Sequence, residues 1–564
     1  MRAAPHRVVA SAAGGLRAAA TAAPKRVVLW FRNDLRLHDN ECLAIAAAAA
    51  KVPGTSVLPV FFLDPRLLAS TRSGHRKLGS YRALFLLQSL EDLRTSLRAK
   101  GSDLLVLRER PEDGLSRLLG PSSLVLTQAE PATEEARVDA AVEAALKATP
   151  GQHELRRVWG STLLHLDDLP LSPGLANLPT VFTPFRTLVE APGRAVPHRP
   201  LFPTAQLPRG SLPLPADAPA AEPLPELAAL GYTPEECAAA LRPDPRAVLA
   251  FRGGESAGLA RLQHYLFGSD ALATYFDTRN GMLGADCSTK FSPWLAHGCL
   301  SPRTVASESA RYERERTKNK STYWIVFELL WRDFLHFCSV AHGRKMFLVG
   351  GFTGNRWAWR SDPAGFAAWK EGRTGHPLVD ANMRELKLSG WMSNRGRQNV
   401  ASFLTQNLGV DWRLGAEYFE AMLNDYDCYS NWGNWLYIAG ITGGRINVFN
   451  IQKQSRDYDP RGDYVRAWLP ELARVPLQYV HAPWTMPLDV QQQAGCVLGV
   501  DYPHPITKDA VRGPGGASYR PAGAGGEGGG GGGRGGGRRG GGGGKDERRS
   551  GNRGRLSEFE RYGS

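Results

Sequence analysis

The feature that most constrains the fold is a series of short apolar runs, separated by longer helix-forming stretches, in the first part of the chain. The runs are VVLWF at 27–31, VLPVFFLD at 57–64, DLLVL at 103–107 and LVLTQ at 124–128. Runs of this length, rich in Val, Leu and Phe, are typical of buried strands. Ala- and Leu-rich segments such as SYRALFLLQSLEDLRTSLRAK lie between them. Strands that alternate with helices predict a parallel sheet with helices on both faces.

The remainder of the chain has a different pattern. Residues 190–250 are crowded with proline and alanine, which predicts a long connector over the surface. From there to about residue 450 the periodicity is helical, and nine of the fourteen tryptophans lie between Trp324 and Trp435. We therefore predict an α/β chain with a doubly wound parallel-sheet domain at 25–188, a connector at 189–250 and an all-helical domain at 251–505.

The net charge of +14 is concentrated at the two ends of the chain. Residues 1–26 carry five basic and no acidic side chains, and residues 513–564 carry ten basic and five acidic ones, which leaves only +4 for the body. The basic balance is therefore weak evidence that the folded part binds nucleic acid.

Both terminal segments have compositions unlike the body. Residues 1–24 are rich in Ala and Arg, contain serine and lack acids, as is typical of a chloroplast or mitochondrial transit peptide; a disordered extension is the alternative. Residues 506–564 include long runs of glycine interrupted by arginine and are predicted to be disordered. Their arginines could contact the phosphates and bases of RNA or DNA, or could simply be solvated.

Two further patterns exclude classes of protein. No apolar run approaches the roughly 18 residues that a membrane-spanning helix needs, so we expect no membrane partner. The seven cysteines are scattered and include no CxxC pair, which indicates a reducing compartment and argues against a structural zinc site. We expect a monomer.

Chemistry-bearing side chains cluster in four segments of the helical half. YFDTRNGMLGADCSTKFSPWLAHGCLSPR (275–303) has a Gly-rich turn and hydroxyls that suit a phosphate, although an ordinary capped helix is the alternative. In YWIVFELLWRDFLHF, Glu328 and Arg332 are four residues apart and so lie on one face of a helix. Because the residues around them are nearly all apolar, we expect both charges to lie close to a buried site; a surface ion pair is the alternative. The others are MRELKLSGWMSNRGRQNVASFL (383–404) and DYDCYSNWGNW (425–435).

Together these segments resemble the flavin-binding helical domain of the photolyase/cryptochrome family. The stretches TRNGMLGADCSTKFSPWLAHGCLSPR and YVRAWLPELARVPLQYVHAPWTMP are similar to its cryptochrome DASH branch. The similarity runs from VVLWFRNDLRLHDN to about residue 505.

The resemblance implies a bound FAD. It places Asn431 opposite flavin N5, and Asp425 and Asp427 at the polar edge of the ring, with Arg397 as the ion partner of Asp425. Further contacts with the cofactor are implied for Tyr275, Ser288, Thr289, Lys290, Phe291, Ser292 and Arg332.

The resemblance also gives a role to three tryptophans. Trp435, Trp412 and Trp359 match the family's electron-transfer chain from the flavin to the surface, with spacings of 23 and 53 residues. Ordinary core packing is the alternative for each indole. In the first domain, Glu130 matches an acid that bonds the pterin of a 5,10-methenyltetrahydrofolate antenna, with an ordinary surface glutamate as the alternative.

Three functions are consistent with this resemblance: light-driven repair of cyclobutane pyrimidine dimers in DNA, a blue-light photoreceptor that binds DNA or RNA, and a nucleic-acid scaffold acting through the tail. Glu328 and Asn394 match lesion-contacting residues, which favours repair. At the positions of a lesion-pocket tryptophan and methionine, this chain has Tyr437 and Gln398, which predicts single-stranded or looped DNA as the substrate. Trp331 and Arg395 are the other expected substrate contacts.

Overall fold

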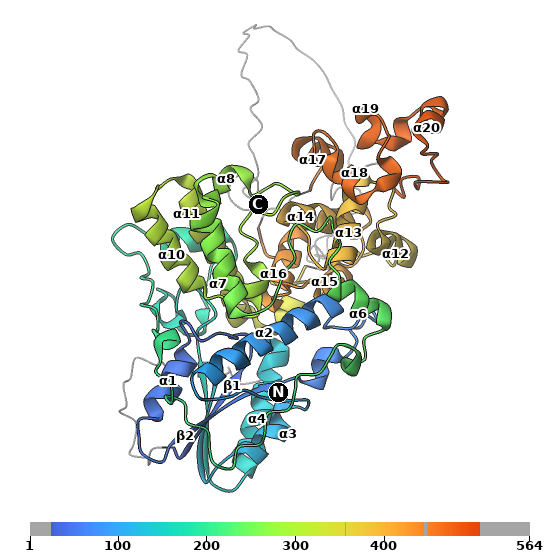
Figure 1. The fold of residues 1–564 in the computed structure, drawn as a ribbon. Helices are drawn as coiled ribbons and strands as arrows, with labels where there is room; N and C mark the ends of the chain where they lie inside the picture. Colours follow the sequence, from blue (N-terminus) through green and yellow to red (C-terminus); the bar gives the residue numbers. More distant parts are fainter. Residues whose placement is uncertain (1–23, 356, 445–447, 508–564) are drawn as a thin grey trace, which may run out of the picture.

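The computed structural model describes residues 24–355, 357–444 and 448–507, and its first domain is built on a parallel sheet. The strands pair in the order β3-β2-β1-β4-β5, and each neighbouring pair is parallel. This confirms the predicted sheet and places the first strand at its centre (Figure 1). The strands are β1 (Arg26–Phe31), β2 (Ser56–Phe62), β3 (Leu105–Leu107), β4 (Ser122–Gln128) and β5 (Gln152–Val158).

Helices cover both faces of the sheet, because alternate residues of each strand point to opposite sides. In β1, Val27, Leu29 and Phe31 belong to one buried core, whereas Val28 and Trp30 belong to another. The first core includes apolar side chains of α1 and α2, and the second those of α3 and α4. The sheet is therefore doubly wound, as predicted. The helices are α1 (Glu41–Ala49), α2 (Ser80–Ala99), α3 (Pro111–Leu118) and α4 (Thr133–Ala148).

The sequence did not predict β5, which pairs with β4 at the edge of the sheet. Its residues, QHELRRV, alternate between exposed and half-buried positions until Val158, which is buried. A polar edge strand lacks the continuous apolar run that marks a strand buried on both faces. The analysis of apolar runs therefore found the four other strands and missed this one.

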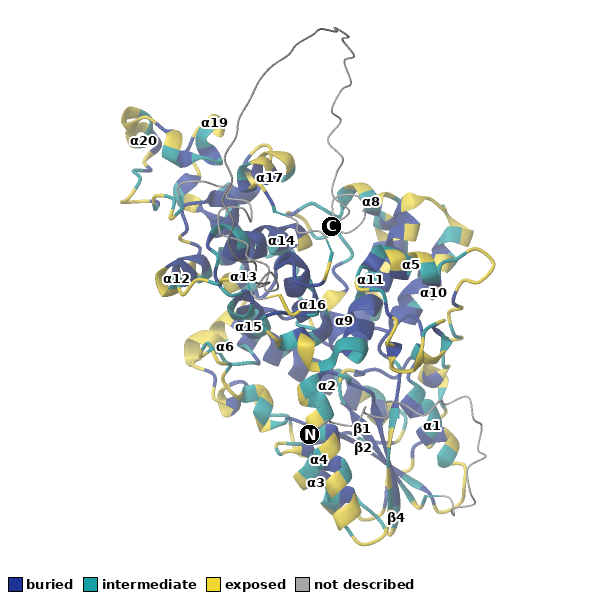
Figure 2. Ribbon diagram, turned by 180° about the vertical axis from the view of Figure 1, so that it is seen from behind, coloured by how far each residue is buried: buried dark blue, intermediate teal, exposed yellow. Residues whose placement is uncertain are grey.

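The remaining part of the chain is helical, as predicted. Its helices are α7 (Glu255–Gln263), α8 (Tyr275–Thr278), α9 (Ser292–Ala296), α10 (Pro302–Glu315), α11 (Lys320–His342), α12 (Pro363–Glu371), α13 (Pro377–Ser389), α14 (Asn394–Ser402), α15 (Trp412–Met422), α16 (Cys428–Ile438), α17 (Ile451–Tyr458), α18 (Asp463–Trp468), α19 (Leu477–Val480) and α20 (Leu488–Ala494). In Figure 2, α11, α13, α14 and α16 are largely buried, whereas α20 lies at the periphery. Among the described residues, none of these helices has both the length and the apolarity needed to cross a bilayer.

The Pro- and Ala-rich connector is anchored at several points instead of lying loosely over the surface. It contains α6 (Pro234–Leu241), which packs against α2. Leu212, Leu230 and Tyr232 are buried, and the Tyr232 hydroxyl donates a hydrogen bond to the backbone oxygen of Leu78. These contacts bind the connector to the first domain along much of its length.

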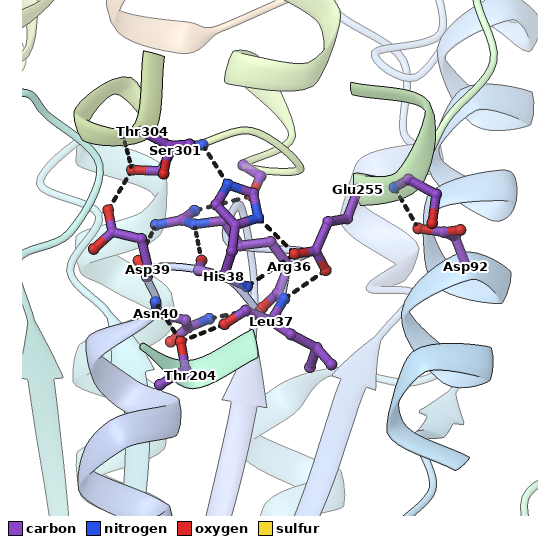
Figure 3. Close-up of polar contacts among 12 residues, drawn as sticks. Arg36, Leu37, His38, Asp39, Asn40, Asp92, Thr204, Glu255, Ser301 and Thr304 are labelled. Atoms are coloured by element: carbon purple, nitrogen blue, oxygen red, sulfur yellow. Dashed lines mark hydrogen bonds and ion pairs between the residues drawn. The ribbon is translucent and has the colours of Figure 1, made fainter. Parts of the chain in front are cut away.

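A buried polar cluster joins the loop after β1 to the beginnings of α7 and α10 (Figure 3). The Glu255 carboxylate accepts hydrogen bonds from the backbone N–H groups of Leu37 (2.7 Å) and His38 (2.8 Å) and pairs with His38 Nδ1 (2.5 Å). His38 Nε2 accepts a hydrogen bond from the backbone N–H of Ser301 (3.2 Å), and the Ser301 hydroxyl bonds to Asp39. Buried polar groups from the two domains thus satisfy one another, which fixes the domains together.

Replacing Glu255 should weaken this interlock strongly. We expect Glu255→Ala to lower the free energy of unfolding by about 3–5 kcal/mol, because breaking a buried pair leaves its partner groups unsatisfied. Urea unfolding followed by far-ultraviolet circular dichroism measures the change. Glu315→Ala is the matched control, because it removes only an exposed ion pair with Arg311 and should have little effect.

The same carboxylate predicts part of the acid sensitivity of the fold. Burial alone would raise the pKa of Glu255, but His38 and the backbone N–H groups hold it below its ordinary value of 4.5. A lowered folded-state pKa contributes stability above the unfolded pKa, and this stability is lost as the pH falls through the folded pKa. Glu255→Gln should therefore lose less stability than wild type below pH 4.5. Parallel acid curves for the two proteins would contradict an ionised Glu255 in the fold.

Candidate active site

Two adjoining cavities, of about 280 and 210 Å³, lie among the buried helices of the second domain. Concave sites with a mixed apolar and polar lining are the usual location of cofactor and substrate binding. Both cavities are lined by residues of the predicted site: Tyr275, Thr289, Phe291, Ser292, Glu328, Arg397, Asp425 and Asp427, together with Ser430. The four sequence segments therefore meet around one space, as a shared binding site requires.

One side of this space is formed by the predicted pair of Arg397 and Asp425. Arg397 Nη2 lies 2.8 Å from Asp425 Oδ2, and its Nε donates a hydrogen bond to the backbone oxygen of Met392. Asp425 is buried, yet its Oδ1 has no hydrogen-bond partner within the described residues. A buried carboxylate oxygen without a donor is costly, so this atom is an acceptor suited to a ligand N–H or O–H group.

Asp427, unlike Asp425, has hydrogen-bond or ion-pair partners on both carboxylate oxygens. Its Oδ1 caps α16 by accepting hydrogen bonds from the backbone N–H groups of Tyr429 and Ser430, each 3.0 Å. Its Oδ2 lies 3.0 Å from Arg332 Nη2 and 3.2 Å from His336 Nε2. Burial alone would raise the pKa of Asp427, but His336, Arg332 and the cap hold it far below its ordinary value. Asp427 is therefore a fixed anion and cannot serve as a proton donor.

The loop before α9 brings hydroxyl groups and a buried amine to the cavity. Ser288, Thr289 and Ser292 line it, and Lys290 Nζ donates a hydrogen bond to Ser288 Oγ (3.2 Å). Lys290 is buried and has a backbone φ of 54°, which is uncommon for a non-glycine residue. Burial lowers the pKa of Lys290 to about 8. The arrangement can offer hydrogen bonds and positive charge to an anionic group such as a pyrophosphate.

Glu328 adds an acid to the lining of both cavities. Its Oε1 accepts hydrogen bonds from Arg279 Nη1 (2.7 Å) and Trp324 Nε1 (3.1 Å). Burial raises the pKa of Glu328 above its ordinary value, although Arg279 opposes the shift. The alternative of a surface pair between Glu328 and Arg332 is wrong, since the two bond to different partners. Both line cavity walls, as the helical spacing predicted.

The other cofactor and lesion candidates also lie near this space. Asn394, Gln398 and Asn431 line the larger cavity, and Asn431 Nδ2 donates a hydrogen bond to the backbone oxygen of Ala416 (3.0 Å). Trp331 and Tyr437 do not line it; their rings pack edge to face, with centroids 5.4 Å apart. The side-chain amides of Asn394, Gln398 and Asn431 thus line the larger cavity, whereas the Trp331–Tyr437 pair lies outside it.

Arg395 is a correction to the predicted substrate contacts. Its side chain is buried and does not line either cavity. The guanidinium turns inward, where Nη1 donates to Gln398 Oε1 (2.9 Å) and Nη2 to Asn280 Oδ1 (3.0 Å), and it lies over the Tyr458 ring. Arg395 thus orients the Gln398 amide from behind the wall instead of reaching a substrate.

The three relay candidates lie in or against the same buried core, in neighbouring elements. Trp435 lines the larger cavity, and its ring approaches Gly415 so closely that a Cβ there would lie 2.2 Å from it. Gly415 is one turn beyond Trp412, which is fully buried. Trp359 is half-buried, and the backbone N–H of the next residue, Arg360, donates a hydrogen bond to Gly409 close to the start of α15. Trp435 thus lies at the cavity, Trp412 in the core and Trp359 at a half-buried position, and electron transfer between them stays a prediction.

Glu130 is buried, so the alternative of an ordinary surface glutamate is wrong. Its Oε1 accepts hydrogen bonds from Asn33 and Gln128, each 3.1 Å, and its Oε2 accepts one from the Tyr429 hydroxyl (2.6 Å). Tyr429 belongs to α16, which also carries the site residues Asn431 and Trp435. Glu130 therefore connects the first domain directly to the helix that lines the cavity.

Sequence reasoning missed two polar residues of the site. Arg279, four residues after Tyr275, is the partner of Glu328, and His336, four residues after Arg332, is a partner of Asp427. The Tyr429 ring also packs on His336, with centroids 4.1 Å apart. Helical spacing from Arg332 could have identified His336. No short-range pattern pairs Arg279 with an acid 49 residues away.

Known proteins share this sequence and architecture. The family models described as DNA photolyase and as the FAD binding domain of DNA photolyase match residues 27–205 and 324–512. A cryptochrome DASH of Ostreococcus tauri, described as chloroplastic/mitochondrial, is 47% identical over 498 residues, which cover 85% of this chain and 90% of that protein. The crystal structure of a Synechocystis cryptochrome has a TM-score of 0.78 at 46% identity and covers 86% of this chain and 97% of its own. That of an Agrobacterium tumefaciens class III photolyase has a TM-score of 0.71 at 29% identity, covering 87% and 96%.

Proposed function

This chain belongs to the cryptochrome DASH group of the photolyase/cryptochrome family, and from that premise we propose that it repairs cyclobutane pyrimidine dimers in single-stranded or looped DNA under blue light. The observation that carries the proposal is Glu328, an acid on a wall shared by both cavities. A protein that only senses light has no need of an acid at this position. We also propose 25–188, 189–250 and 251–505 as the domain boundaries.

The residues around the cavities fit FAD. Asp425 Oδ1 can accept a hydrogen bond from the polar edge of the ring, and Arg397 pairs with the other oxygen of that carboxylate. The hydroxyls of Ser288, Thr289 and Ser292, with Lys290, suit its pyrophosphate. When bound, reduced and excited by blue light, FAD supplies the electron that splits the dimer.

Glu328 and Asn394 would hold the substrate. Because burial raises the pKa of Glu328, its protonated form is more populated than that of an ordinary glutamate and can donate a hydrogen bond to a pyrimidine carbonyl. Asn394 and Gln398 add amide groups on the same cavity. The acid must leave Arg279 or share it when it bonds to the substrate.

The second candidate is a blue-light photoreceptor that binds DNA or RNA without repair. The ion pair between Arg279 and Glu328 favours it, since that pair already occupies the acid. Dimer loss under blue light, measured with and without the tail, tests the two functions. Repair by both proteins supports the lyase, whereas light-dependent nucleic-acid binding without dimer loss supports the photoreceptor.

We propose that Glu130 also holds a folate antenna. A carboxylate oxygen accepts about two hydrogen bonds, so Oε2 can accept one from a pterin besides that from Tyr429. Glu130→Ala should weaken folate retention and reduce near-ultraviolet absorption after saturation with folate and washing. Glu134→Ala, at an exposed position on α4, is the control. Equal spectra for wild type and Glu130→Ala would remove Glu130 from the antenna site.

The Gly- and Arg-rich tail and the transit peptide lie almost wholly outside the described residues, since 1–23 and 508–564 are not described. We propose a chloroplast or mitochondrial location, which the organelle described for the Ostreococcus tauri relative supports. A fusion of residues 1–24 to a fluorescent protein tests the targeting.

Deleting residues 513–564 should weaken binding to single-stranded nucleic acid and flatten its salt dependence. Each lost phosphate contact on a single strand should reduce the log–log slope by roughly 0.7. Fluorescence anisotropy with a labelled oligonucleotide over a salt series measures this. A tail with lysine for arginine should keep most of the slope, whereas glutamine for arginine should lose it. An unchanged slope on deletion would show that the tail does not touch phosphates.

A further inference from the structure

Trp435 contacts a second buried tryptophan that the predicted relay does not include. Trp369, on α12, lies edge to face with Trp435, with ring centroids 6.3 Å apart and an interplanar angle of 72°. Phe419 packs against both rings, 5.1 Å from Trp435 and 6.3 Å from Trp369. These separations are those of direct aromatic contact. An oxidised Trp435 would therefore have Trp369 as an immediate neighbour.

The surroundings of Trp369 suit an electron donor. The indole is fully buried, and its Nε1–H donates a hydrogen bond to the backbone oxygen of Val400 (3.0 Å). The negative end of that carbonyl dipole lies at the indole nitrogen, where it favours positive charge on the ring. Trp412 has a similar environment, since it is also fully buried and its Nε1–H donates to the backbone oxygen of Val349 (3.3 Å).

The next aromatic residue outward is Tyr418, whose ring lies 5.8 Å from that of Trp369 and 5.2 Å from that of His75. A tyrosine that gives up an electron must also release its phenolic proton. The Tyr418 hydroxyl donates to the backbone oxygen of Lys370 (3.3 Å), which is not a base, and burial raises the pKa of Tyr418 well above its ordinary value. A positive charge that reaches Trp369 therefore stops there.

We propose that Trp369 is a second electron donor to Trp435, and that it forms a side branch of the relay. One electron passes from the neutral Trp369 indole to the Trp435 radical cation. Trp435 returns to its neutral form and Trp369 becomes the radical cation. No proton moves, because Nε1–H stays bonded to Val400. The branch rests on the proposed light-driven function, since only photoexcitation of the bound cofactor oxidises Trp435.

The branch is tested where the main route is blocked. In cofactor-loaded Trp412→Phe protein, a blue flash should produce a tryptophan radical-cation absorption that decays several-fold more slowly than in Trp412→Phe/Trp369→Phe. Trp412→Phe/Trp468→Phe is the matched control, because Trp468 is an equally buried indole of the same core. It should decay like Trp412→Phe alone. Equal decay with and without Trp369 would overturn the branch.

A further variant separates failure of the branch from failure of the proposed function. Trp435→Phe should abolish the radical signal. A radical signal of wild-type size in Trp435→Phe would overturn the relay itself. Loss of the signal in Trp435→Phe, together with equal decay in Trp412→Phe and Trp412→Phe/Trp369→Phe, would overturn only the branch. If Trp412→Phe/Trp369→Phe loses its cofactor, the location of the tryptophan radical is measured in Trp412→Phe, from the dipolar coupling between the two light-induced spins. A coupling that places the second spin at Trp359 would contradict the branch.

Discussion

Trp435→Phe is expected to abolish most light-driven reduction of the bound cofactor. In the proposed relay, Trp435 is the indole that lines the cavity, so electrons from Trp412, Trp359 and Trp369 would reach the cofactor through it. Phenylalanine keeps the ring but is much harder to oxidise. We expect the rate under blue light with a thiol reductant to fall by about tenfold or more, equivalent to a barrier higher by about 1.4 kcal/mol.

The control for this variant has to exclude damage to the site. Trp435 also packs on Phe419, so its loss could disturb the cavity wall. Cofactor content and the thermal midpoint are therefore measured first, and Trp468→Phe serves as the buried-tryptophan control. Photoreduction of Trp435→Phe at the wild-type rate would show that the tryptophan path is not the route of electrons.

The sequence predicted those features that are marked by a local pattern or by several motifs in the order and spacing of a known family. Apolar runs located four strands, and the family resemblance, with its matching tryptophan spacings, pointed to three indoles that the structure places in neighbouring elements. The resemblance also implied the pairing of Arg397 with Asp425, and the cost of burying an unpaired carboxylate supported it.

The features that were missed depend on contacts between distant segments. Arg279 meets Glu328 across 49 residues, and Trp369 meets Trp435 only through the packing of α12 against the core. Arg395 was assigned to the substrate from its place in the segment 383–404. Only the fold shows that its side chain turns inward to Asn280. A residue's place in a motif therefore predicted its neighbourhood well and its direction poorly.

The second large effect concerns the form of the substrate. Extruding a dimer from a duplex costs a few kcal/mol, which single strands largely avoid. Apolar packing around the extruded lesion can offset that cost. In this chain the cavity wall presents Gln398, whose amide is held by the buried Arg395, so the wall is polar and supported by a charge. Tyr437 packs on Trp331 and does not line the cavity.

We therefore expect dimers in single-stranded DNA to be repaired much more efficiently than dimers in intact duplex. A cost of about 3 kcal/mol that is not offset corresponds to roughly a hundredfold difference at subsaturating DNA. The measurement is dimer loss per absorbed photon on matched oligonucleotides, single-stranded, duplex and with the lesion in an unpaired loop. The looped substrate is the control, because it keeps the flanking duplex but removes the cost of unpairing, and it should behave like the single strand. Equal efficiency on all three would refute the argument from the polar wall, and absence of repair on all three would assign the protein to the photoreceptors.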